Sequence, residues 1–116
     1  MTVATQLEDH KNWLEDNGGP RLDFRGRLIV GEDFSGLDLR FATFANAVFK
    51  SCNFNNSKLA GVNCTYAVFE KCIMVNANLD HSNLAGTNFQ KCNTKGMTFY
   101  NVLTDDDTNL QEQSKC

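Results

Sequence analysis

The sequence places a large apolar side chain at every fifth position over more than eighty residues. In blocks of five counted from Leu22, the third residue is Phe, Leu, Ile or Met in fourteen of seventeen blocks. A period of five fits neither an α-helix, with about 3.6 residues per turn, nor a flat strand, with a period of two. The sequence therefore predicts a repeat architecture. The third positions are Phe24, Ile29, Phe34, Leu39, Phe44, Phe49, Phe54, Leu59, Cys64, Phe69, Met74, Leu79, Leu84, Phe89, Thr94, Phe99 and Thr104.

The first position of the block is small in most of the repeat. From Ala42 to Cys92 it is always Ala, Cys, Ser, Thr or Val. The spacing of two between the small and the large residue is typical of a short extended segment with alternate residues on one face. A turn must then follow, and the fifth position suits one because it often holds Gly or Asn. These residues are Gly26, Gly31, Gly36, Gly61, Gly86 and Gly96, and Asn46, Asn56, Asn76 and Asn101.

One short face cannot bury its own Phe, so we expect the chain to wind around a shared axis and its coils to stack. Stacked coils hydrogen-bond at the spacing of neighbouring strands, about 4.8 Å. This arrangement leaves open edges only at the two ends of the stack.

The blocks ANLDH and SNLAG, with their small–polar–Leu pattern, resemble the repeats of the pentapeptide-repeat proteins. The resemblance covers residues 22–106. It implies an all-β fold, a right-handed quadrilateral β-helix with four blocks per coil. Seventeen blocks then make about four coils, a solenoid roughly 19 Å long.

We expect three parts: a capping helix in residues 1–20, the β-helix in 21–106 and a polar tail in 107–116. The segment Thr5–Glu8 is a candidate capping box, and Gly18, Gly19 and Pro20 stop the helix. Trp13 is expected to cover the first coil. Arg27 and Glu32 occupy small-residue positions there, where they pair, meet water or lie under the helix.

Three of the five cysteines, Cys52, Cys72 and Cys92, are twenty residues apart and so belong to one inward column. Together with Cys64 they are expected to be buried thiols in a reducing compartment. A disulfide or metal function is the alternative, although the chain has no Cys-x-x-Cys pair. We expect no metal and no cofactor. Cys116 lies in the tail and is expected to be exposed.

At 116 residues the chain has room for one domain, and it has no apolar run of 18 residues. It also has no signal-peptide pattern, so we expect a cytoplasmic protein. His10 and His81 are the only histidines, and Asp80 beside His81 is the nearest approach to a catalytic pair. Because catalysis needs convergent groups, the sequence predicts that the protein is not an enzyme.

Outward aromatic residues are the best candidates for binding. Alternatively, Phe41 packs under the helix and the tyrosines are ordinary surface residues. Ile73 and Val75 form a second apolar spot that suits self-association, so a homodimer is possible. The partner-binding candidates are Arg40, Phe41, Tyr66, Asp80, His81 and Tyr100.

Some pentapeptide-repeat proteins, including gyrase-protecting quinolone-resistance proteins, imitate the width and negative surface of B-DNA. In this chain residues 42–101 hold five lysines against two acids, and the acids gather at the ends. The body of the repeat is therefore mildly basic, which disfavours mimicry. Weak nucleic-acid binding remains an alternative. Its candidate basic face comprises Lys50, Lys71, Lys91 and Lys95.

The sequence thus predicts a non-enzymatic interaction module with a protein partner. On the family's precedent, the module would modulate or inhibit a nucleic-acid-processing partner and could be phage-encoded. The alternatives are a DNA mimic or weak nucleic-acid binder, and a structural cap or spacer in an assembly.

Overall fold

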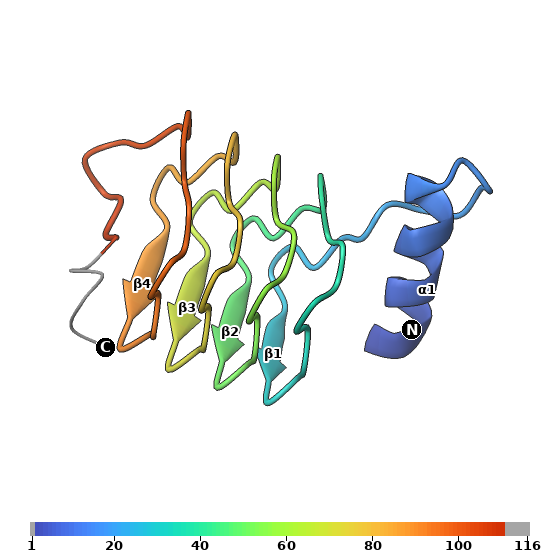
Figure 1. The fold of residues 1–116 in the computed structure, drawn as a ribbon, viewed down its shortest axis with the longest axis horizontal. Helices are drawn as coiled ribbons and strands as arrows, with labels where there is room; N and C mark the ends of the chain where they lie inside the picture. Colours follow the sequence, from blue (N-terminus) through green and yellow to red (C-terminus); the bar gives the residue numbers. More distant parts are fainter. Residues whose placement is uncertain (1, 111–116) are drawn as a thin grey trace.

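The computed structural model describes residues 2–110, which form one helix followed by a stack of coils (Figure 1). Helix α1 spans Val3–Leu14, and the strands are β1 (Leu28–Val30), β2 (Val48–Lys50), β3 (Val68–Glu70) and β4 (Asn88–Gln90). The four strands form one parallel sheet in chain order. Helix α1 lies at one end of the stack, beyond the coil that holds β1.

Neighbouring coils pair with an offset of twenty residues. Ile29 lies opposite Phe49, Phe49 opposite Phe69, and Phe69 opposite Phe89. Three further columns of single parallel bridges begin at Asp23, Asp33 and Asp38 and advance by the same step. A coil therefore contains four blocks of five residues, and the predicted stacking of coils by parallel backbone hydrogen bonds is confirmed.

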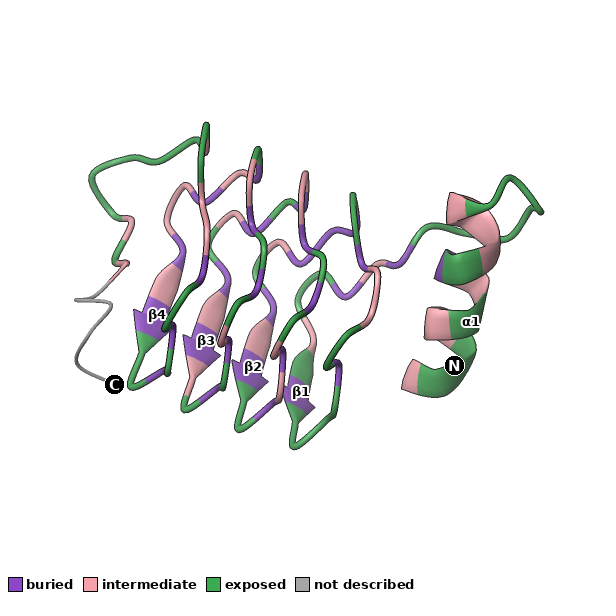
Figure 2. Ribbon diagram, in the orientation of Figure 1, coloured by how far each residue is buried: buried purple, intermediate pink, exposed green. Residues whose placement is uncertain are grey.

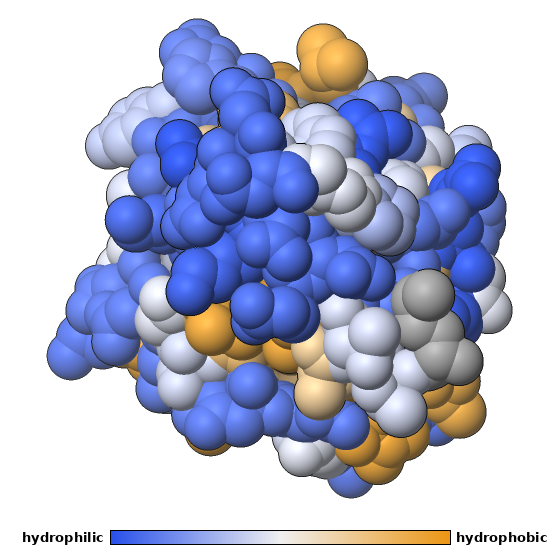
Figure 3. Space-filling view, turned by 90° about the vertical axis from the view of Figure 1, so that its right-hand side faces the viewer, coloured by the Kyte–Doolittle hydropathy of each residue, from blue (hydrophilic) through white to orange (hydrophobic). Residues whose placement is uncertain are grey.

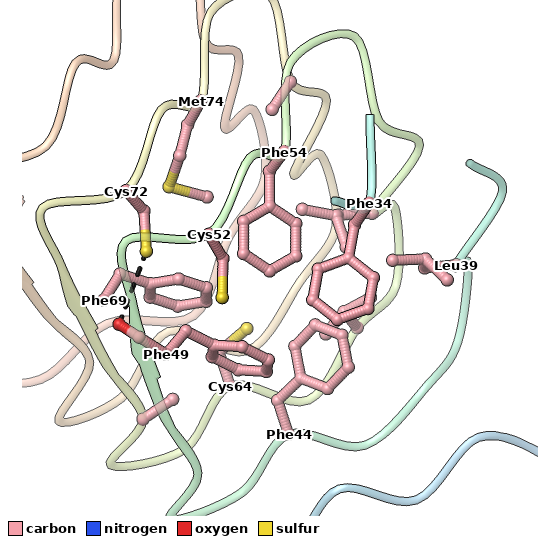
Figure 4. Packing of buried hydrophobic residues seen from close by; sticks show 14 of the residues in the cluster. Phe34, Leu39, Phe44, Phe49, Cys52, Phe54, Cys64, Phe69, Cys72 and Met74 are labelled. Atoms are coloured by element: carbon pink, nitrogen blue, oxygen red, sulfur yellow. Dashed lines mark hydrogen bonds between the residues drawn. The ribbon is translucent and has the colours of Figure 1, made fainter. Parts of the chain in front are cut away.

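The third residue of nearly every block points into the interior. In Figure 2 the middle residue of each strand is buried and the flanking residues are more exposed. The rings of Phe49, Phe69 and Phe89 stack face to face, with centroid distances of 5.1 and 4.9 Å. Figure 4 shows how the rings of Phe34, Phe44, Phe49, Phe54 and Phe69 fill the interior. Each buried Phe contributes about 1.5–3 kcal/mol to folding. The pattern weakens at the last coil, where Phe99 is half-buried and Thr104 is exposed.

The cysteine column lies inside the stack, as predicted. Cys52, Cys72 and Cys92 are buried thiols, and each donates a hydrogen bond to a carbonyl of the preceding coil, such as Cys72 Sγ to the Phe49 oxygen at 3.3 Å (Figure 4). Hydrogen bonding to its two neighbours, aided by burial, raises the pKa of Cys72. Burial alone raises the pKa of Cys64. These thiols pack as small apolar groups. Cys116 lies outside the described residues.

The fifth residue of each block turns the corner in the left-handed region, with φ between 55° and 73° from Gly26 to Asn101. The sequence predicted this conformation from Gly and Asn. In the structure, six corner residues other than Gly and Asn also adopt this left-handed conformation, although they tolerate it less well. These are Phe41, Ser51, Tyr66, Lys71, His81 and Lys91.

Asp or Asn at the second position of a block closes the turn that follows. The Asp38 carboxylate accepts a hydrogen bond from the Arg40 N–H, and the Asn63 side-chain oxygen accepts one from the Thr65 N–H. The same i to i+2 bond forms at the second-position residues Asp23, Asp33, Asn53, Asn78, Asn83 and Asn93, and also at Asp105, the fourth residue of its block. These side chains therefore stabilise the corners.

Helix α1 begins earlier than predicted. Thr2 is its N-cap and accepts a hydrogen bond from the Thr5 N–H, so the capping box at Thr5–Glu8 is wrong. Val3 and Leu7 pack against the core. Gln6 donates to the Asp23 carbonyl at 3.1 Å. The helix thus satisfies a backbone group of the first coil that has no preceding coil to pair with.

His10 makes the second attachment of α1. It is buried, its Nδ1 accepts from the Leu22 N–H at 2.9 Å, and its Nε2 lies 3.0 Å from the Arg40 carbonyl. An acceptor Nδ1 and a donor Nε2 define the neutral ring. Desolvation by burial lowers the pKa of His10 below 6.5.

The first coil places Arg27 and Glu32 apart. Arg27 donates to the Gln6 side-chain oxygen and lies over the Phe24 ring, 5.3 Å from its centroid. Ion pairs in the described part of the chain join Asp23 to Arg25 and Asp38 to Arg40. Pairing of Arg27 with Glu32 is therefore wrong, because the helix offers Arg27 a partner.

The stack extends past residue 106. Asn109 bridges to Asn88 with an offset of twenty-one, so one extra residue is accommodated near Asp105. Thr108 donates to the Leu84 carbonyl at 2.8 Å, and Leu110 packs against the core. The segment up to residue 110 thus partly covers the last coil. The remainder of the predicted tail, 111–116, lies outside the described residues.

We predict that acid weakens the attachment of α1 through His10. Because the folded protein favours the neutral ring, the unfolded chain binds the proton more readily, and stability present above pH 6.5 is lost as the pH falls through the lowered pKa. Denaturant titrations at about pH 7.5 and about pH 5.5 should show a smaller free energy of unfolding at the lower pH, where most carboxylates remain ionised. The decrease should be smaller in His10→Gln and unchanged in His81→Gln, whose ring is exposed. Equal decreases in all three proteins would contradict the role of His10.

Candidate interaction surface

Five of the six predicted partner-binding residues lie along one corner of the stack. Phe41, Gly61, His81 and Asn101 occupy its left-handed positions in successive coils. Arg40, Ala60, Asp80 and Tyr100 immediately precede them. The structure therefore brings together Arg40, Phe41, Asp80, His81 and Tyr100 on one corner.

Tyr66 lies on the neighbouring corner, in the column of Asn46 and Gly86. The face between the two corners carries the bridge column from Asp23 through Thr43, Asn63 and Asn83. We name this face with its two aromatic corners the aromatic surface. Its most exposed large apolar side chains are Phe41, Tyr66, Tyr100 and Leu103, which are 48%, 52%, 69% and 64% exposed.

The rings of Phe41 and Tyr66 pack directly against glycines of the next coil. A methyl group on Gly61 would lie 2.6 Å from the Phe41 ring, and one on Gly86 would lie 2.4 Å from the Tyr66 ring. The side chain at a corner therefore extends along the stack onto the next corner. The sequence carries a signal for this contact that the predictions above do not include, namely a glycine twenty residues after an aromatic residue.

Trp13 extends the aromatic surface beyond the first coil. Its ring meets Phe41 edge-on with centroids 6.5 Å apart and stacks on His10 at 5.5 Å. The Arg21 guanidinium lies over the Trp13 ring, 5.8 Å from its centroid. Trp13 is only half-buried, so it both packs at the helix end and contributes to the surface. Phe41 contacts the helix through Trp13 but is not covered by it.

Two open depressions meet at Phe41. One, of about 490 Å³, lies on the face between the aromatic corners, and the other, of about 410 Å³, lies below the end of α1. Their shape suits protruding side chains of a macromolecule rather than an enclosed small molecule. The first is lined by Arg21, Asp23, Arg25, Phe41, Ala42, Thr43, Gly61 and Asn63, and the second by Trp13, Leu14, Asp16, Gly18 and Phe41.

The charged candidates are partly engaged within the chain. The Arg40 guanidinium pairs with Asp38 at 2.8 Å, and this hydrogen bond holds the pKa of Asp38 below its usual range. The Asp80 carboxylate accepts a hydrogen bond from the Tyr100 N–H at 2.9 Å. Asp80 therefore orients the backbone at Tyr100, and the structure shows no hydrogen bond between its carboxylate and the His81 ring.

The lysines divide between two corners. Lys50, Lys71 and Lys91 follow one corner beside the strands, whereas Lys95 lies beyond the next face, in the column of Asn55 and Val75. The predicted basic face is therefore a row of three lysines with a fourth set apart. Within residues 2–110, no group of three or more His, Cys, Asp or Glu side chains could hold a metal ion. The single helix among these residues is too short and too polar to cross a membrane.

The family model for pentapeptide repeats matches residues 33–63 and 63–93, with eight copies of the repeat. These matches cover more than half of the chain and coincide with the coils that bridge at offsets of twenty. The chain therefore belongs to the pentapeptide-repeat family, as its sequence pattern indicated.

Solved structures of the family share the fold. Alr5209, a pentapeptide repeat protein from Nostoc PCC 7120, matches with a TM-score of 0.81 at 21% identity, covering 96% of this chain and 86% of that one. HetL, involved in heterocyst differentiation regulation in the same cyanobacterium, matches with a TM-score of 0.71 at 20% identity, over 78% of this chain and 43% of HetL.

A pentapeptide repeat protein of the Arabidopsis thaliana thylakoid lumen matches with a TM-score of 0.52 at 26% identity, over 72% of each chain. No curated protein sequence matches the chain. At these identities the likeness to alr5209 and HetL shows the fold alone.

We predict that Gly61→Ala destabilises the protein more than Gly36→Ala. Both glycines have φ near 70°, so both variants carry the same left-handed strain, but the space beside Gly36 is empty whereas the Phe41 ring covers Gly61. The extra cost should be about 1–3 kcal/mol, typical of overpacking. Urea titration measures it. In the double variant Phe41→Gly/Gly61→Ala the cost of the alanine, measured against Phe41→Gly, should fall to that of Gly36→Ala, and equal costs for the two single variants would contradict the ring contact.

Proposed function

We propose that this protein is a non-enzymatic interaction module that binds a protein partner through the aromatic surface. The observation that carries the proposal is the conformation of Phe41 and Tyr66. Each is a bulky residue in the left-handed region, where a non-glycine residue costs about 1–2 kcal/mol, and each ring stays half exposed. Gly or Asn, which occupies most other corners, would avoid this cost. Strain retained together with exposure supports a binding role.

The surroundings of the two rings support a macromolecular partner. Rigid aromatic side chains backed by packing are typical anchors of protein interfaces, and Arg21 and Arg25 add charged groups beside Phe41. The interior of the coils is filled with Phe rings, so ligands meet only the outer faces. We therefore propose that Trp13, Phe41 and Tyr66 anchor the partner. His81 and Tyr100, further along the stack, would add contacts to it.

On the precedent of the family, we propose that the protein is phage-encoded and that its binding modulates or inhibits a nucleic-acid-processing partner. We further propose that the coils form a right-handed quadrilateral β-helix capped by α1 and that the protein acts in the cytoplasm. Contacts of Gln6 and His10 with the first coil support the capping role. The buried free thiols suit a reducing compartment.

Affinity capture from a lysate of the organism that encodes the protein tests the proposal. Wild type should retain a partner that Phe41→Asn/Tyr66→Asn loses by at least about tenfold, because truncating aromatic anchors removes most of the binding energy. Asn tolerates the left-handed region, so this variant should keep its fold, and its thermal melt provides the check.

The matched control is Lys50→Ala/Lys91→Ala, which removes exposed charges on another corner. It should retain the partner. Equal capture by wild type and the double Asn variant would refute the aromatic surface. Selective loss in the lysine variant, with salt-sensitive binding to a DNA duplex, would favour the nucleic-acid alternative.

A further inference from the structure

The loop that follows α1 contains Asn17 and Gly18, the only Asn–Gly pair in the sequence. This loop projects beyond the C-terminal end of the helix (Figure 1). Both residues are exposed, and Figure 3, which looks onto this end of the molecule, shows a mostly hydrophilic surface. Water therefore reaches the Asn17 side chain and the peptide bond that joins it to Gly18.

Few contacts hold this pair in place. Within residues 2–110 the Gly18 N–H donates no hydrogen bond, and nothing lies within 4 Å of a methyl group placed on its Cα. The Asn17 side chain makes one long contact, from Nδ2 to the Glu15 carboxylate at 3.4 Å. Gly18 and Gly19 have φ of 85° and 86°, and glycine leaves this conformation for others at little cost. The Gly18 nitrogen can thus approach Cγ of Asn17.

The asparagines of the coils are held differently. At Asn56 the N–H of the next residue, Ser57, donates to the Phe54 carbonyl at 3.1 Å. A nitrogen in such a bond attacks the preceding side chain only after the coil opens locally. The following N–H is bonded in the same way at Asn46, Asn53, Asn55, Asn63, Asn76, Asn78, Asn83 and Asn88.

We propose that Asn17 is a self-modification site, at which the chain converts an amide to a carboxylate without an enzyme. The Gly18 nitrogen attacks Cγ of Asn17, so that a new C–N bond forms and the bond from Cγ to Nδ2 breaks. Ammonia leaves with the proton of the Gly18 nitrogen, and a cyclic succinimide remains. Water then opens the ring at either carbonyl and gives aspartate or isoaspartate. The net reaction consumes water and releases ammonia.

The new charge lies where the helix disfavours it. The C-terminal end of a helix carries partial negative charge on its unpaired carbonyls, and Glu15 and Asp16 are already acidic there. The Asn17 amide donates to the Glu15 carboxylate, whereas a carboxylate at position 17 repels it. Isoaspartate also lengthens the main chain next to the Asn17 N–H, which donates to the Asn12 carbonyl at 2.8 Å. Both products therefore weaken the C-terminal end of α1.

This end of α1 also carries Trp13, which lies in the last turn of the helix. Asp16 and Gly18 line the same depression as Trp13. A carboxylate added between Asp16 and Gly18 makes that depression more acidic as the protein ages. The reaction itself needs no partner at the aromatic surface, so it proceeds whether or not the proposed function is correct.

Incubation of the full-length protein in mildly alkaline buffer, with and without guanidinium chloride, tests the proposal. Peptide mapping by mass spectrometry, with an isoaspartyl methyltransferase as the reagent for isoaspartate, locates each converted residue. In the folded protein, conversion at Asn17 should exceed conversion at Asn56 at least about tenfold, because the Ser57 N–H must first be released. In denaturant, which opens the coils, this ratio should fall. No conversion at Asn17 in the folded protein, or equal conversion at the two residues, would overturn the proposal.

Asn17→Asp reproduces the added charge directly. It should lower the melting temperature by about 1–5 °C relative to wild type, whereas Asn17→Gln, which retains the amide, should not. The matched control is Gln90→Glu, the same exchange of amide for carboxylate at the exposed end of β4. It should not melt below wild type. Equal losses in Asn17→Asp and Gln90→Glu would contradict a specific effect at the end of α1.

Discussion

In-register stacking of inward side chains, one coil above the next, holds this molecule together. Phe49, Phe69 and Phe89 stack at centroid distances of 5.1 and 4.9 Å, and the backbone hydrogen bonds between coils keep the same step. Because parallel strands are about 4.8 Å apart, only rings in nearly parallel planes fit such a column. Small residues such as Cys52 and Cys72 must then occupy the neighbouring column, since the interior holds one large side chain per block.

The same constraint determines the outer surface. A corner every five residues requires the left-handed conformation at each fifth position, and the side chain there extends onto the next coil. Phe41 and Tyr66 are accommodated because Gly61 and Gly86 follow twenty residues later. The exposed aromatic residues are therefore part of the corner geometry, and the combination of a bulky exposed ring with a left-handed backbone distinguishes them from the other corner residues.

The period of five was enough to predict stacked coils with inward side chains, because these depend on side-chain size at fixed spacing, and the family resemblance, which implies four blocks per coil, added the inward columns and the cysteine ladder. The sequence did not predict that Thr2 caps α1, that His10 is buried or that Arg27 turns toward Gln6. These features depend on contacts between the helix and the first coil, which lie outside the repeat. The bridges confirm the offset of twenty that the family resemblance implied, and this offset places Tyr66 on a separate corner from Phe41.

Excision of one coil tests the central claim, that twenty residues form the stacking unit. Deletion of residues 62–81 joins Gly61 to Ser82 and keeps every column in register, so the shortened protein should melt cooperatively at a lower temperature than wild type. Deletion of residues 62–83 removes two residues more. The remaining residues are too few to complete the coil in register, so this deletion should abolish the cooperative transition. Similar melting of the two shortened proteins, or loss of cooperativity in the first, would contradict the account.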